Sequence, residues 1–384
     1  MARAPTAALV AIGLFWGSLA GYMPEIKART GLSDVALGAT LLMSSLGAVV
    51  ATALAPRMTR LLGHRLLPTY GIALALVFMP LSLAQGPLAL GGAMLLAGLL
   101  VTGLDIGANL RISALESDSA APLMNLCHAC YSLTFAAVAL AIAGLRAVEV
   151  PVTVTLPALA LIALGLALSA MRGGRMPAPV PEPAASVQGA TRVALWPLIL
   201  PGGAILFCAF IGENGIEAWS ALHLERTLGA AAGAGALGPF MMGLVMGLGR
   251  LGGQAVAARL GAARLIAVSA VVAVLGLLML AAAQNGAVAL AGIALGAAGL
   301  AVLVPTGSSL IGRLGAARAG ERGRTLGVSR AWMFGMLGFF AGPTMMGALS
   351  EAAGLRMAFA VLALVVGLIL PALVLLLRAG RHGA

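Results

Sequence analysis

Four polar side chains lie close together between residues 103 and 132, where the sequence is otherwise strongly apolar. Asp105 and Asn109 are four residues apart and Asn125 and His128 are three apart, so on helices each pair shares one face. An ionisable group in an apolar span is costly and usually faces a partner or a water-filled path, and histidine titrates near neutral pH. The four residues therefore indicate a proton- or solute-binding cluster. The alternative is a hydrogen-bonded clamp between two helices.

A second polar group, Glu213, Asn214 and Glu217, interrupts another apolar stretch. Glu213 and Glu217 share a helix face, and Gly215 lies between them. A polar break that contains glycine resembles the discontinuous helices that line transporter sites, which predicts a broken helix with Glu213 in a cavity. The alternative is an early helix end that leaves both glutamates in water. Trp16, deep in the first apolar stretch, either stacks on a sugar ring or packs in the core.

The residues that support enzymatic chemistry are sparse. The three cysteines, Cys127, Cys130 and Cys208, all lie in apolar stretches, and there are four histidines in the chain. A zinc site needs about four ligands, and no second cluster completes the pair of cysteines around His128. The sequence also contains no phosphate-binding G-x-x-x-x-G-K-[ST] loop. We therefore expect no metal, no cofactor and no ATP-driven step, and a membrane enzyme is a minor alternative.

The composition places these residues in a membrane. Of the 384 residues 61% are hydrophobic and only 9% are charged, whereas soluble domains contain about 25% charged residues. The chain therefore lacks the charge to cover a soluble surface and is predicted to cross a bilayer several times. Its net charge is +11, but the basic residues are spread over short loops, so we expect no binding to nucleic acid.

A spanning helix needs about 20 mostly apolar residues, and the sequence contains twelve such stretches. Strands are not expected, because the stretches lack the alternation of barrel strands. We expect a short polar turn at Arg111–Ser119 between the fourth and fifth spans. The predicted spans are Thr6–Met23, Val35–Ala55, Leu66–Ala84, Leu88–Ile112, Leu123–Leu145, Val150–Met171, Leu195–Leu222, Ala230–Val256, Leu265–Ala283, Ala287–Ile311, Leu326–Leu349 and Met357–Leu377.

The basic residues are distributed unevenly across these spans. If the N-terminus is cytoplasmic, the opposite side holds only Lys27, Arg29, Arg146, Arg226 and Arg356, and all the others of the 23 basic residues lie on the cytoplasmic side. Cytoplasmic loops carry an excess of lysine and arginine. The bias therefore favours cytoplasmic N- and C-termini and supports the number of spans.

The widest hydrophilic break, Arg172–Arg192, is rich in proline and has the composition of a linker. The basic, glycine-containing loop at residues 59–65 is repeated at 258–264, in the equivalent position after the break. A parallel repeat of six-helix units is a known transporter architecture. The predicted division is an N-terminal six-helix half at 1–171, a cytoplasmic linker at 172–193 and a C-terminal six-helix half at 194–384.

Twelve spans, a central linker and paired basic loops resemble the major facilitator superfamily over essentially the whole chain. The strings at residues 23–27, 105–109, 125–132, 213–220 and 249–253 are similar to small bacterial inner-membrane proteins of the YbjJ type, near the fucose:proton symporter branch. The resemblance implies an all-α membrane protein in which two halves enclose a solute site. It also implies a location in the bacterial inner membrane.

The resemblance further implies that the basic cytoplasmic loops take part in gating, with Arg57, Arg60, Arg65, Arg250 and Arg259 as candidates. The loop motif of the superfamily normally carries an acidic residue before its arginine, and the first loop here has none. The acid–base latch that helps to hold the outward-facing state is therefore expected to be weak or rebuilt.

These observations together predict a secondary-active transporter that moves a small polar solute, such as a sugar, by alternating access. Coupling to protons is expected through Asp105, His128 and Glu213. Aromatic residues make up only 4% of the chain, which favours a polar solute over the large apolar pocket of a drug exporter. The alternatives are a proton-driven drug or metabolite efflux antiporter and, less favoured, a non-transporting sensor or scaffold. The expected partners are the solute, protons and the lipid bilayer, and the protein is expected to act as a monomer.

Overall fold

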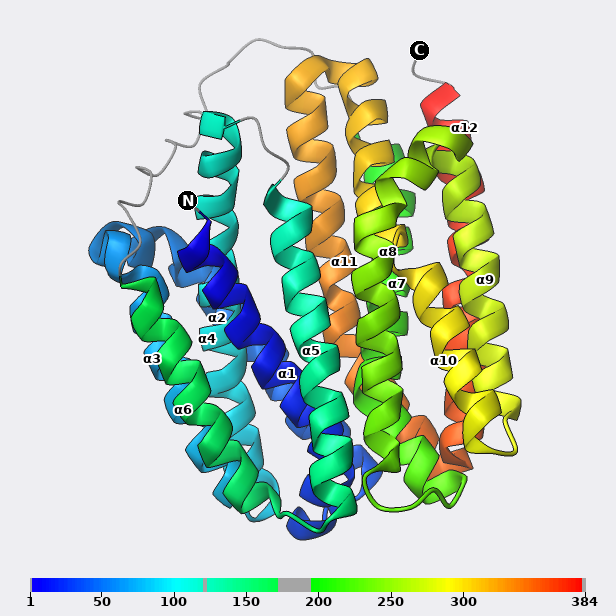
Figure 1. Cartoon of the computed structure of the whole chain (residues 1–384). Helices are drawn as coiled ribbons and strands as arrows, with labels where there is room; N and C mark the ends of the chain where they lie inside the picture. Colours follow the sequence, from blue (N-terminus) through cyan, green and yellow to red (C-terminus); the bar gives the residue numbers. More distant parts are fainter. Residues whose placement is uncertain (1, 120–122, 172–194, 382–384) are drawn as a thin grey trace.

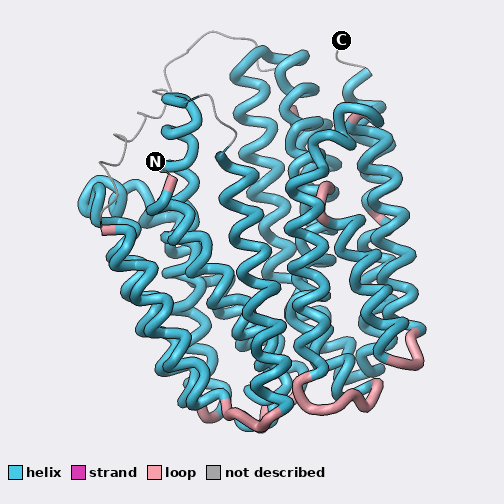
Figure 2. The backbone as a smooth tube through the Cα atoms, viewed as in Figure 1, coloured by secondary structure: helices cyan, strands magenta, loops and turns pink. Residues whose placement is uncertain are grey.

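The computed structural model describes residues 2–119, 123–171 and 195–381, and these residues form helices joined by short turns (Figures 1 and 2). No strand occurs in these ranges. Both chain termini lie at one end of the helical bundle, which we call the terminal end; the other is the far end. The α-helices are α1 (Arg3–Thr30), α2 (Asp34–Leu62), α3 (Leu66–Leu83), α4 (Gly86–Ser119), α5 (Leu123–Ala147), α6 (Val152–Ala170), α7 (Trp196–Leu222), α8 (Leu237–Leu260), α9 (Ala262–Ala282), α10 (Gly286–Leu300), α11 (Leu303–Gly367) and α12 (Ile369–Arg381), with short turns η1 (Gly63–Arg65), η2 (His223–Thr227) and η3 (Ala234–Ala236).

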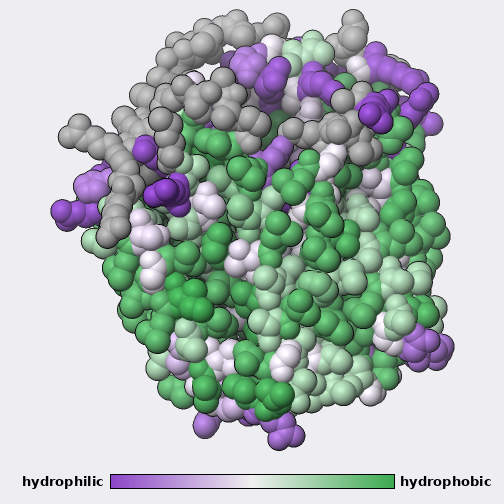
Figure 3. Space-filling model, in the orientation of Figure 1, coloured by the Kyte–Doolittle hydropathy of each residue, from purple (hydrophilic) through white to green (hydrophobic). Residues whose placement is uncertain are grey.

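The helices are long and apolar enough to cross a membrane, and on the face seen in Figure 3 hydrophobic side chains form a broad band between more hydrophilic ends. The described ranges contain nine such apolar helical stretches, one of which joins α2 to α3 and another of which runs from α10 to α12. Within α11 the backbone leaves the helical region at Gly320 (φ 61°) and Gly354 (φ 79°), conformations that glycine adopts without strain. The chain reverses direction within α11 (Figure 1). The arrangement is therefore consistent with the twelve predicted spans.

The polar segment Arg111–Ser119 is helical, and the prediction of a turn there was wrong. This segment continues α4 beyond its apolar part, and the Glu116 carboxylate accepts a hydrogen bond from the backbone N–H of Met124 (2.8 Å). Met124 lies in the first turn of α5, where backbone N–H groups have no partner within the helix. A carboxylate is favoured at that position, so the extension of α4 stabilises the start of α5.

Helices α1–α6 pack mainly on one another, as do α7–α12, and the two groups meet through α1 with α7, α5 with α8 and α2 with α11. This packing agrees with two six-helix halves, although the domain boundaries stay a prediction. The proposed linker at 172–193 lies outside the described residues.

Glycines allow α2 and α4 to approach closely. A Cβ atom at Gly98 of α4 would overlap the backbone carbonyl oxygen of Ser44 in α2, and a Cβ at Gly47 would overlap that of Leu95. At Gly92, also in α4, a Cβ would have no heavy atom within 4 Å. Side chains at the first two positions would therefore force the helices apart.

We expect Gly98→Val to lower the unfolding temperature by about 3–10 °C, because overpacking of this kind costs about 1–3 kcal/mol. Gly92→Val is the matched control, since it adds the same side chain to the same helix in open space. Thermal unfolding of the two purified variants in detergent measures the difference. Equal unfolding temperatures would contradict the close approach of α2 and α4.

Candidate functional site

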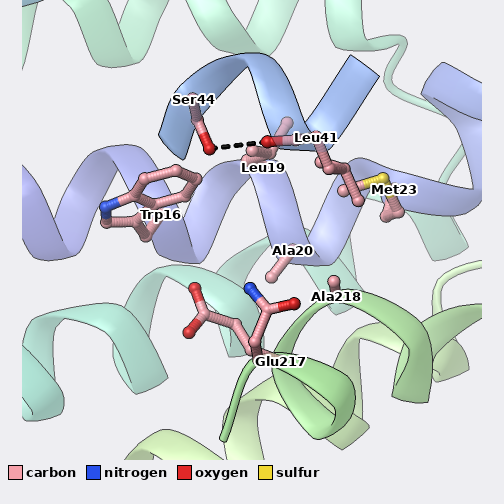
Figure 4. Close-up of a pocket in the computed structure, with 9 residues that line it drawn as sticks. Trp16, Leu19, Ala20, Met23, Leu41, Ser44, Glu217 and Ala218 are labelled. Carbon is pink, nitrogen blue, oxygen red and sulfur yellow. Dashed lines mark hydrogen bonds between the residues drawn. The ribbon is translucent and has the colours of Figure 1, made fainter. Parts of the chain in front are cut away.

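Two cavities lie where α1–α6 meet α7–α12. The first is a cavity of about 40 Å³ between α1, α2 and α7, and Trp16, Ser44, Asn214 and Glu217 are among its lining residues (Figure 4). The second is a cavity of about 50 Å³ between α5, α7 and α8, and its lining includes Glu213, Glu217 and Arg250. Glu217 lines both cavities, so the two spaces adjoin at this carboxylate. Both volumes are well below the roughly 300–1,000 Å³ that is typical of small-molecule sites.

Helix α7 brings Glu213 and Glu217 to the cavities on one continuous face. The prediction of a broken helix near Gly215 was wrong, because α7 is unbroken from Trp196 to Leu222. Gly215 instead provides close packing, since a Cβ there would lie 2.5 Å from Leu362 Cδ2. The alternative of an early helix end also fails, because both glutamates lie within the helix and are partly buried.

Asn214 and Trp16 give the first cavity its remaining chemistry. The Asn214 side-chain oxygen is buried beside Gly342 of α11 and has no hydrogen-bond partner in the described structure. Trp16 comes from α1, and its ring packs edge-on against Phe15 with 5.3 Å between ring centroids. The indole of Trp16 and the carboxylate of Glu217 point into the same space from opposite helices (Figure 4). An aromatic face and acceptor groups therefore line one small cavity.

The cluster predicted on the fourth and fifth spans comes together through Asn109. The side-chain N–H of Asn109 donates to Asp105 Oδ2 (3.0 Å), and its side-chain oxygen lies 2.9 Å from His128 Nε2. If Asn109 Oδ1 is the acceptor, as this pairing requires, His128 carries a proton on Nε2. The chain of bonds ties α4 to α5 and could also hold a proton. Asn125 is half-buried one turn before His128 on α5.

Arg250, which the predicted span Ala230–Val256 contains, lies in helix α8 and lines the second cavity, and its gating role stays a prediction. Arg250 lies within α8, ten residues before the helix ends at Leu260. Its Nη1 donates to Ser132 Oγ (2.6 Å), and its guanidinium carbon lies 5.7 Å from the centre of the Tyr131 ring. The other four loop candidates are exposed: Arg57 and Arg60 near the end of α2, Arg65 in η1 and Arg259 near the end of α8.

Charged residues that the sequence analysis did not select join the two groups of helices at the far end. Arg226 of η2 donates to both carboxylate oxygens of Asp34 at the start of α2, each at 2.6 Å. Arg146 of α5 donates to both carboxylate oxygens of Glu225, at 2.5 and 2.9 Å. We call these four residues, Asp34, Arg146, Glu225 and Arg226, the clasp.

Neighbouring groups hold the clasp in place. Ser350 of α11 hydrogen-bonds to Asp34, and Lys27 Nζ lies 3.1 Å from Asp34 Oδ1. Glu225 Oε1 also accepts from the backbone N–H groups of Gly233 and Gly235, each at 3.2 Å. Because Glu225 and Arg226 are adjacent in a single turn of π-helix, one turn binds two helices of the other group. Such π-turns occur frequently at functional sites.

No family model matches this sequence. The chain is 25% identical over 361 residues to an uncharacterised MFS-type transporter of Yersinia pestis, covering 92% of this chain and 89% of the relative. It is 26% identical over 359 residues to the membrane protein MosC of Rhizobium meliloti, covering 89% and 82%.

Solved structures with a similar fold are transporters. One is a bacterial homologue of the human lysosomal transporter Spinster in an inward-facing, occupied conformation (TM-score 0.74, 15% identity, covering 99% of this chain and 96% of that one). Another is the nucleoside transporter NupG (TM-score 0.71, 12% identity, covering 98% of each chain).

This chain is an all-helical membrane protein with the major facilitator fold. Its relatives and structural neighbours support placing it in the major facilitator superfamily. Where their names state a function it is transport, which agrees with the prediction that the chain is not an enzyme.

Proposed function

We propose that this protein is a proton-coupled, secondary-active transporter of a small polar solute. The observation that carries the proposal is the position of Glu217, which lines both cavities between the two groups of helices. A carboxylate shared by two adjoining spaces can respond to a solute in one and to a proton in the other. Ionisable groups in membrane-spanning helices are costly, and where they occur they commonly mark such pathways.

Glu213 and the cluster around Asn109 are the further proton-binding groups of the proposal. Glu213 lies one helical turn from Glu217 in the second cavity, which it shares with Arg250. Asp105 and His128 line neither of these cavities. The bond between His128 and Asn109 links α5 to α4, and Asp105 binds the same asparagine from within α4. Protonation of either group would change the contacts between helices that must move for alternating access.

The clasp supports a direction of opening. Its two ion pairs join α1–α6 to α7–α12 at the far end, so the protein is closed there. We place the protein in the bacterial inner membrane as a monomer, with cytoplasmic termini. The clasp then closes the periplasmic side, and the solute reaches the cavities from the cytoplasm. A sugar or related solute, as in the fucose:proton branch, fits the aromatic face of Trp16 beside the acceptors Asn214 and Glu217.

Uptake into proteoliposomes under an imposed pH gradient tests this proposal. We expect the gradient to drive uptake of at least one solute from a panel of sugars, sugar acids, nucleosides and amino acids. In Glu217→Gln that uptake should fall by about tenfold or more, because the side chain can no longer exchange a proton. Glu213→Gln and Asp105→Asn test in the same way whether Glu213 and the cluster around Asn109 take part in proton coupling. Glu321→Gln, at an exposed position on α11, is the control.

Two results would overturn the proposal. One is the absence of gradient-driven uptake for every solute in the wild-type protein. The other is uptake that keeps its dependence on the gradient in all three cavity and cluster variants. Uptake only of lipophilic cations in exchange for protons would favour efflux instead.

A further inference from the structure

Arg250 differs from the clasp arginines in forming no ion pair within 4.0 Å with an acidic residue of the described chain. None of the ion pairs within 4.0 Å that the described residues form includes Arg250, although Glu213 and Glu217 line the same cavity. Arg146 and Arg226, by contrast, each bind both oxygens of a carboxylate. Each clasp arginine therefore binds a carboxylate through two hydrogen bonds, the geometry that guanidinium favours. Arg250 has no such carboxylate among the described residues.

Ser132 and Tyr131 hold Arg250 without neutralising it. Ser132 Oγ accepts from Arg250 Nη1 (2.6 Å) and donates to the backbone carbonyl of His128 (3.2 Å), so the hydroxyl is fixed as an acceptor for the guanidinium. The Tyr131 ring lies against the guanidinium group. A guanidinium has five N–H donors, and among the described residues only Nη1 has a protein acceptor. The guanidinium therefore has donors left with which to bind a ligand in the second cavity.

A partly buried guanidinium that no carboxylate binds directly keeps part of its desolvation cost, and this cost falls when an anion binds to it. Guanidinium recognises carboxylate through two parallel hydrogen bonds. On the other side of Glu217, the polar residues Asn214 and Ser44 and the aromatic side chain of Trp16 line the first cavity. The two adjoining spaces therefore offer a cation for an acid group, then acceptors for hydroxyl groups.

We propose that the transported solute is a small hydroxylated organic acid, such as a sugar acid, whose carboxylate binds Arg250. The inference rests on the proposed transport function and names its substrate class. The solute carboxylate enters a cavity that Glu213 and Glu217 also line, so it is accommodated when one of these glutamates carries a proton. The guanidinium then balances the solute, the protonated glutamate donates a hydrogen bond, and anion and proton travel together.

Ligand-dependent thermal stabilisation of the purified full-length protein tests the inference with matched solutes. The acids are D-gluconate and D-glucuronate, and the neutral counterparts are D-glucitol and D-glucose. We expect an acid to stabilise the wild-type protein and its neutral counterpart to have at least tenfold lower affinity. In Arg250→Gln the affinity for the acid should fall by about 10- to 100-fold, as for loss of a hydrogen-bonded charged group.

Two further variants separate recognition from folding. Arg250→Lys keeps the charge but loses the two-pronged geometry, so its affinity should lie between those of the wild-type protein and Arg250→Gln. Arg324→Gln removes an exposed arginine from α11 and should bind as the wild type does. If Arg250→Gln does not fold, Ser132→Ala replaces it: it leaves the charge but removes the hydroxyl that positions it, and should weaken binding of the acid.

Binding of the acid that survives both Arg250→Gln and Ser132→Ala would overturn the inference. So would a neutral solute that binds as well as its acid, or a panel in which no acid binds. Proton-driven uptake of a neutral sugar would overturn this inference about the substrate class, but it would leave the proposed transport function standing.

Discussion

Replacing Asp34 with asparagine is expected to open the far end of the bundle. The Asp34 side chain is only 5% exposed and receives hydrogen bonds from Arg226 and Ser350, with Lys27 at 3.1 Å. A neutral side chain at this position would leave the two cations without a counter-charge. Breaking a buried pair by removing one partner costs about 3–5 kcal/mol, and because Arg226 is 42% exposed we expect the lower end of that range. A cost of this size is enough to shift a closed–open equilibrium by about a hundredfold.

The order of effects within this ion pair is also predicted. Arg226→Gln leaves Asp34 with Lys27 and Ser350 as partners, so it should open the far end less than Asp34→Asn does. Glu321→Gln breaks the ion pair with Arg324, whose side chains are 78% and 54% exposed, and should change nothing because exposed pairs contribute little.

Distances between spin labels at Glu149 and Ala232, measured by double electron–electron resonance, follow the opening. Both positions are exposed, in the α5–α6 connection and in the turn before η3. We expect a longer-distance population in Asp34→Asn, a smaller one in Arg226→Gln and none in Glu321→Gln. Identical distance distributions in all variants would mean that the pair does not hold the far end closed.

The sequence predicted the spans well because the bilayer imposes a length and a composition that a single chain must satisfy. It predicted helix ends poorly. Apolar residues end at the membrane surface, but a helix can continue beyond that surface because its backbone hydrogen bonds do not depend on apolar side chains. α1 continues from the predicted end at Met23 to Thr30, and α4 continues from Ile112 through the polar segment to Ser119. The same limit explains the wrong break in α7, where Gly215 serves packing against Leu362.

Only those contacts of the candidate site that follow from the spacing of residues within one chain segment could be predicted. Asp105 and Asn109 meet because they are one turn apart, and His128 joins them from the next helix. The predicted span Ala230–Val256 contains Arg250, but the count of basic residues by side grouped it with the cytoplasmic loops, so its place in the cavity lining was not predicted. The clasp could not be found this way, since Arg226 and Asp34 are 192 positions apart and each alone resembles a solvated charge.

Glu225→Gln is expected to open the far end as well, and its combination with Asp34→Asn tests whether the clasp acts as one unit. Glu225 is 14% exposed and its partner Arg146 only 7%, so the neutral variant leaves a buried guanidinium. The remaining acceptors of Arg146 are the Gly21 carbonyl at 3.3 Å and the more distant Glu25 at 3.7 Å. Because Glu25 remains as a counter-charge, we expect a cost to the closed state of about 3 kcal/mol, the lower end of the range for breaking a buried pair.

The adjacent positions of Glu225 and Arg226 make a further, quantitative prediction. Both ion pairs depend on one five-residue turn, η2. If one ion pair is broken, the turn is held less firmly, and the second η2 residue is no longer aligned with its own partner. The free-energy shift of the double variant, from the same label distances, should therefore be smaller than the sum of the single shifts by about 0.5–3 kcal/mol. Glu321→Gln combined with Asp34→Asn should show no such coupling. Additive shifts for the two clasp variants would mean that each pair holds its own helix, and that η2 does not transmit the loss of one contact to the other.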